Sequence, residues 1–108
     1  MGVTTEGVGQ CGGSAYPIGG EYASTLQGWF RMLGGGAVDI DWNTLQGWRE
    51  RVEGQGTGIN IAPYVGHNTL REIAMGREGE GGEAYLPTEE QVSEMCCLLA
   101  EAMEEGAF

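Results

Sequence analysis

The sequence predicts an α/β fold with parallel strands, and three observations support this prediction. Two short apolar runs, over 3–8 and 59–65, have the residue types of buried strands. Each run ends in a polar turn that contains glycine, and segments with the apolar spacing of amphipathic helices follow. Strands that alternate with helices favour parallel β/α units, which present polar side chains at the carboxyl ends of their strands.

The N-terminal part is expected to form a strand, a loop and a helix. The strand spans 3–8, and the Tyr-Pro and Gly-Gly pairs make 12–20 a loop. Ser24 is a suitable N-cap for a helix over about 25–33, which the glycines at 34–36 end.

A second helix and a second strand follow. Asp41 or Asn43 caps this helix, which ends near Glu53, and the strand then spans 59–65. The apolar faces of the first two helices are expected to pack in the core through these residues: Leu26, Trp29, Phe30, Leu33, Leu45, Trp48 and Val52.

The C-terminal part is expected to be helical. A short helix spans about 68–75, and Asn68 or Thr69 caps it. Thr88 and Gln91 have the spacing of a capping box for a last helix. The predicted core stripe of that helix consists of Val92, Met95, Cys96, Leu99, Ala102 and Met103.

The chain is interpreted as a single unit made of five segments. They are a strand and cysteine loop (1–20), a helical insert (21–57), a strand, histidine turn and helix (58–76), a mobile loop (77–87) and a helix (88–108). Because two parallel strands are too few for a self-standing sheet, the unit is expected to be an internal fragment.

Composition excludes several classes of function. The 108 residues carry a net charge of −11, with 16 acidic residues against five Arg. The chain therefore lacks the cationic surface that nucleic acid or an anionic membrane requires, and neither partner is expected. No run of about 18 apolar residues predicts a membrane span, and no signal peptide is recognisable. Three cysteines, two of them adjacent, make no disulfide framework and favour a reducing, cytoplasmic location.

Three segments, in order along the chain, resemble the N-acyl-D-amino-acid deacylases, or D-aminoacylases, of the amidohydrolase superfamily. They are Gly-Val-Thr-Thr through Val-Gly-Gln-Cys-Gly (2–12), Ile-Asn-Ile-Ala-Pro-Tyr-Val-Gly-His-Asn-Thr-Leu-Arg (59–71) and Glu-Ala-Met-Glu-Glu-Gly-Ala-Phe (101–108). The resemblance implies a partial (β/α)8 TIM-barrel-like fragment, with roughly two parallel β/α units and extra helices. It also implies zinc-dependent hydrolysis of the amide bond of N-acyl-D-amino acids.

Cys11 is the expected metal ligand. Its Gly-Gln-Cys-Gly setting matches the zinc-binding cysteine of the family, although an ordinary loop cysteine is the alternative. The resemblance places the His-x-His pair before Met1, and the later histidines and the catalytic aspartate after Phe108, so the catalytic residues are unknown. Because a catalytic zinc takes about three protein ligands, the chain alone is expected to be inactive.

His67 and Arg71 are the expected substrate-binding residues. His67 follows the second strand, and Arg71 lies one helical turn further on the same face, where a guanidinium would bind a substrate carboxylate. The alternatives are a histidine bonded to backbone at a helix start, and an ion pair of Arg71 with Glu72 or another acid. A nucleophilic pair of Cys11 with His67 is a rival enzymatic interpretation.

A non-enzymatic role is the alternative function. A small acidic α/β module with exposed strand edges would bury them against a partner or against a second copy of itself.

Overall fold

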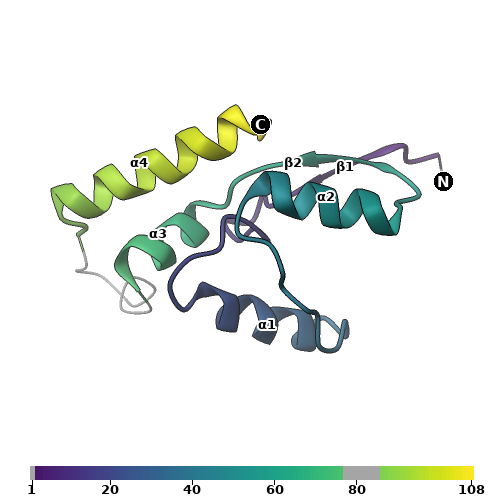
Figure 1. Ribbon diagram of the computed structural model, residues 1–108, viewed down its shortest axis with the longest axis horizontal. Helices are drawn as coiled ribbons and strands as arrows, with labels where there is room; N and C mark the ends of the chain where they lie inside the picture. Colours follow the sequence, from purple (N-terminus) through teal and green to yellow (C-terminus); the bar gives the residue numbers. More distant parts are fainter. Residues whose placement is uncertain (1, 77–85) are drawn as a thin grey trace.

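The computed structural model describes residues 2–76 and 86–108 (Figure 1). Residues 77–85, most of the predicted mobile loop over 77–87, lie outside this description. In chain order the elements are β1 (Thr5–Val8), α1 (Tyr22–Met32), α2 (Leu45–Gln55), β2 (Asn60–Pro63), α3 (His67–Met75) and α4 (Glu89–Glu104). No helix in the described part of the chain has the length and apolarity of a membrane span.

The two strands form a parallel sheet, and their carboxyl ends lie together. Thr5 pairs with Asn60 at one end of the ladder, and Val8 pairs with Pro63 at the other. Figure 1 shows the two strands side by side, with α2 along them and α3 leading away from the end of β2. The turns that follow the strands therefore leave the sheet at the same edge.

The expectation of a TIM-barrel-like fragment is wrong. The described residues form a small α/β domain with four helices and a sheet of just two strands. In a barrel, side chains from the strands fill the interior, but here Thr5 and Glu6 of β1 are exposed. The core lies instead between the helices and the loop that follows β1.

Two clusters of buried side chains form this core. The first consists of Tyr16, Leu45, Ala102 and Ala107, and the second of Tyr22, Leu26 and Trp42. The Trp42 side chain, which the sequence patterns missed, donates its indole N–H to the carbonyl of Ala15 at 2.7 Å. Trp29, Phe30 and Trp48 are partly buried against the second cluster, as their helical spacing predicts.

The starts of α1 and α2 differ from the predictions, and the start of α4 agrees with them. α1 begins at Tyr22 after Glu21, so Ser24 is not its cap. Thr44, not Asp41 or Asn43, caps α2 by accepting the N–H of Gly47. The capping box of α4 is confirmed.

The predicted core stripe of α4 is largely wrong. Only Met95 and Ala102 are buried, because α4 packs along α3 on one side and exposes its other side. Val92, Leu99 and Met103 are 42%, 41% and 49% exposed. This apolar face of α4 is therefore on the surface of the described structure.

Candidate functional site

The turns after β1 and β2 are hydrogen-bonded to each other. Just beyond β2, the N–H of Tyr64 donates to the carbonyl of Val8 at 2.8 Å. The carbonyl of Gly12 then accepts the N–H groups of Asn68 and Thr69, at 2.8 and 3.2 Å. These N–H groups belong to the first turn of α3, which has no partners for them within the helix. The backbone after β1 therefore caps α3, in place of the Asn68 or Thr69 side chain.

Glycines make this close approach possible. Gly12 has a φ of +86°, which favours glycine, and a Cβ there would lie 2.8 Å from Nδ2 of Asn68. A Cβ on Gly66 would lie only 2.3 Å from the carbonyl oxygen of Gly12. The two turns can pack this tightly only without side chains at these positions.

A buried hydrogen-bond network fixes the loop after β1 onto α3. The Thr69 hydroxyl, which is fully buried, accepts the N–H of Ser14 at 2.9 Å and donates to the Tyr22 hydroxyl at 2.8 Å. Tyr22 in turn donates to the Ser14 carbonyl at 2.5 Å. The Ser14 hydroxyl accepts the N–H of Gly66 at 3.0 Å. Sequence reasoning missed this network, because Ser, Thr and Tyr so far apart in the chain give no local pattern.

Cys11 and His67 lie in these two bonded turns. The Cys11 thiol is free and exposed, and His67 is the exposed first residue of α3. No hydrogen bond joins the Cys11 and His67 side chains within the described residues, so the nucleophilic pair stays a prediction. The structure does bring both residues to the carboxyl end of the sheet, where the sequence places them.

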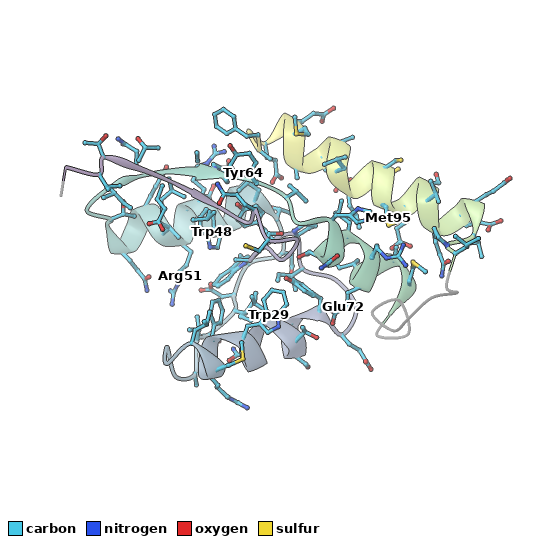
Figure 2. All side chains as sticks on the ribbon, turned by 180° about the vertical axis from the view of Figure 1, so that it is seen from behind. Trp29, Trp48, Arg51, Tyr64, Glu72 and Met95 are labelled. Carbon is cyan, nitrogen blue, oxygen red and sulfur yellow. The ribbon has the colours of Figure 1, made fainter. Side chains whose placement is uncertain are left out.

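Arg71 lies one turn beyond His67 on α3. Its side chain is partly buried and already has an interaction partner. Its neighbour Glu72 is buried, and its carboxylate accepts a hydrogen bond from the Thr25 hydroxyl of α1. Figure 2 shows Glu72 on the side of α3 that faces α1. Glu72 therefore links two helices, whichever group Arg71 contacts.

The donor groups near Cys11 do not complete a metal site. Within residues 2–76 and 86–108, no three or more His, Cys, Asp or Glu side chains are placed to hold one ion. A catalytic zinc takes about three protein ligands and keeps one position open. A zinc site that used Cys11 would therefore need further ligands from outside the described residues.

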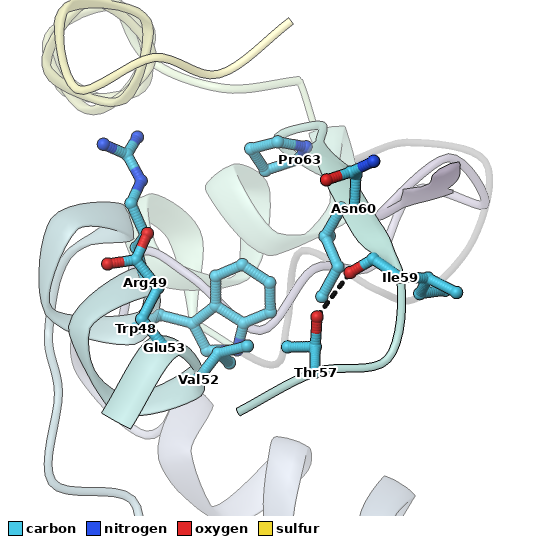
Figure 3. A pocket seen from close by; sticks show the side chains of 9 residues that line it. Trp48, Arg49, Val52, Glu53, Thr57, Ile59, Asn60 and Pro63 are labelled. Atoms are coloured by element: carbon cyan, nitrogen blue, oxygen red, sulfur yellow. Dashed lines mark hydrogen bonds between the residues drawn. The ribbon is translucent and has the colours of Figure 1, made fainter. Parts of the chain in front are cut away.

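A concave feature lies between α2 and β2, and sequence reasoning gave no signal for it. It is a cavity of about 440 Å³ beside Trp48, Val52, Ile61 and Pro63 (Figure 3). The cavity has an apolar floor and a polar rim. Its residues come from α2, from β2 and from the loop between them, so their common location shows only in the fold.

Comparisons with known proteins give weak relationships. The chain is 29% identical over 111 aligned residues to uncharacterized proteins of Mycobacterium tuberculosis and Mycobacterium bovis. The alignment covers 97% of this chain but 18% of each relative, so the chain spans about a fifth of their length. No family model matches the chain, and no solved structure matches it.

Proposed function

We propose that this chain supplies part of the active site of a zinc-dependent amidohydrolase that cleaves the amide bond of N-acyl-D-amino acids. Cys11 would be one metal ligand, and His67 and Arg71 would contact the substrate. In this proposal the chain works in the cytoplasm, and on its own it is inactive.

The observation that supports the proposal is the junction of the two turns. Parallel strands place their functional groups at one edge, and here the Gly12 carbonyl holds the first turn of α3 directly. The exposed thiol of Cys11 and the exposed imidazole of His67 therefore lie on connected backbone. Such a junction is suited to a ligand that both turns contact.

The metal would supply the chemistry, and the chain's own residues would supply position. A bound zinc ion polarises an amide carbonyl and activates water. Since Cys11 by itself would supply only one of about three protein ligands, no reaction step can be assigned to this chain alone. Its expected contribution is to hold the Cys11 sulfur in place through the buried contacts of Ser14 and Thr69.

The test compares substitutions in the longest natural polypeptide that contains this sequence. Cys11→Ser is expected to remove zinc, measured by mass spectrometry, and to lower hydrolysis of N-acetyl-D-amino acids by at least about 100-fold. Cys97→Ser, which changes another exposed cysteine, is the matched control and should alter neither. Full zinc content and activity in the Cys11 variant would contradict the proposal, as would equal hydrolysis of the L-enantiomers.

A second candidate function is that of a non-enzymatic acidic module that associates through its exposed surfaces. The exposed apolar face of α4, with Val92, Leu99 and Met103, favours it, because such a surface is typical of a contact region. The open edges of the two-stranded sheet also favour it. Two findings together would support this alternative. They are the identification of a binding partner and the absence of any change in hydrolase activity when Cys11 is replaced by Ser.

A further inference from the structure

The cavity between α2 and β2 is shaped to receive a large apolar side chain. Figure 3 shows Trp48 and Val52 of α2 on one side of the cavity and Pro63 of β2 on another, and Ile61 of β2 also lines it. The Trp48 ring packs against the buried Tyr16 ring, with 4.8 Å between their centroids. The indole therefore presents a fixed apolar surface to whatever enters the cavity.

The free edge of β2 adjoins this cavity. Asn60 and Tyr64 donate their N–H groups to β1, so alternation along the ladder turns the N–H and C=O of Ile61 to the opposite edge. The Pro63 carbonyl confirms this direction, because it accepts the N–H of Phe108 at 2.9 Å. Since the ladder turns Ile61 away from β1 and no described residue outside the ladder bonds its backbone, one pair of strand hydrogen bonds is open beside the cavity.

Charge on the rim indicates which side chains fit. Glu53 lines the cavity and forms no ion pair with the described residues. Arg49, the cation on the rim, donates instead to the backbone carbonyl of Glu105. With a net charge of −11, the chain favours a basic partner and disfavours a second copy of itself.

We propose that this edge and cavity bind an extended segment of another protein by strand addition. The backbone of the segment pairs with Ile61, and a large apolar side chain enters the cavity against Trp48. Basic side chains on the same face of the segment lie near Glu53. Sheet edges recognise extended peptides in this way: main-chain hydrogen bonds give affinity, and a pocket for every second side chain gives specificity. This proposal does not rest on the hydrolase function. It specifies the partner of the second candidate function, that of a non-enzymatic acidic module.

The test uses the full 108-residue chain and the peptide Thr-Arg-Val-Phe-Val-Arg-Thr, acetylated and amidated at its ends. Its two Arg and its Phe share one face of a strand, because side chains alternate. Calorimetry is expected to give a micromolar Kd. The same peptide with N-methyl groups on its three central residues is expected to bind at least about tenfold more weakly, because it lacks the strand N–H donors.

Two protein variants separate the cavity rim from general charge attraction. Glu53→Lys is expected to weaken binding about fivefold or more. Glu50→Lys changes the net charge equally on the same helix but away from the cavity, and should have little effect. Circular dichroism checks that both variants fold.

Four outcomes would overturn the proposal. They are failure of the peptide to bind, equal binding of the N-methylated peptide, equal weakening by the two Glu→Lys changes, and a dimer in sedimentation that excludes the peptide. The last would identify a second copy as the occupant. None of them affects the zinc and hydrolysis measurements, so the two proposals fail independently.

Discussion

At the scale of single residues, the candidate site depends on two glycines, because only residues without a side chain fit where the two turns meet. Gly12 and Gly66 lack side chains, so the backbone after β1 reaches the first turn of α3 and bonds it. The buried Thr69 hydroxyl then holds that backbone in place. Cys11 and His67 are therefore exposed, but the backbone that carries them is held by buried hydrogen bonds. Residues that position a ligand need such support.

Gly66→Ala is expected to destabilise the chain strongly. The new Cβ would lie 2.3 Å from the oxygen and 2.6 Å from the carbon of the Gly12 carbonyl, and backbone cannot move aside cheaply. We expect a loss of about 1–3 kcal/mol in the free energy of unfolding, measured with urea.

Gly54→Ala is the control for this change. It adds the same methyl group inside α2, where nothing lies within 4 Å, and should raise stability by about 0.5–1 kcal/mol. Equal stability of the Gly66 variant and the unmodified chain would show that the two turns are not in tight contact.

At the scale of elements, neighbouring residues specify where α4 starts, but part of its apolar surface has no packing partner in the described structure. Thr88 accepts the N–H of Gln91, and the Gln91 side chain returns a bond to the N–H of Thr88. The backbone N–H of Glu90, followed by the Thr88 hydroxyl, lowers the pKa of the Glu90 carboxyl from 4.5. One face of the helix packs on α3, while the adjacent apolar face, with Val92, Leu99 and Met103, has no cover in the described structure.

Thr88→Ala is expected to weaken α4 in a pH-dependent way. At pH 7 the loss of the cap should cost about 1 kcal/mol in thermal unfolding. Because the folded pKa of Glu90 is lowered, its contribution is present above pH 4.5 and lost as pH falls through the folded value. The cost of the substitution should therefore be smaller at pH 3 than at pH 7.

Ser93→Ala, an exposed change in the middle of the same helix, serves as the reference and should be nearly neutral at both values. A cost for Thr88→Ala that grows on acidification would contradict the assigned direction of the Glu90 pKa.

Elements whose signals are local could be predicted from the sequence, and those that depend on packing could not. The capping box of α4 and the direction of the strands follow from adjacent residues and from element order. Periodicity identifies the apolar face of α4 but not what covers it, so Leu99 was predicted to be buried and is exposed. For the same reason, Trp42 and the link between Ser14 and Thr69 were missed, because tertiary contacts alone create them.

At the scale of the whole molecule, a small core opposes a large negative charge. The buried side chains form two small clusters, and the sheet adds little to them. Against this, 16 acidic residues face five Arg, and one surface ion pair, Arg51 with Asp41 at 3.5 Å, joins the described residues. Repulsion among like charges favours the expanded chain, so the acidity that promotes solubility also reduces stability.

Added salt is therefore expected to stabilise the chain. Raising NaCl from 10 to 150 mM shortens the screening distance from about 30 Å to about 8 Å, which weakens repulsion between carboxylates in the folded state. Circular dichroism at pH 7 should show a rise of several degrees in Tm, by roughly 4–8 °C for each 1 kcal/mol gained.

The matched experiment near the isoelectric point, at about pH 4.2, should show a much smaller rise, because positive and negative charges then balance. A Tm at pH 7 that is unchanged or lowered by NaCl would mean that charge repulsion does not limit stability. The small size of the core would then be what limits the stability of the chain.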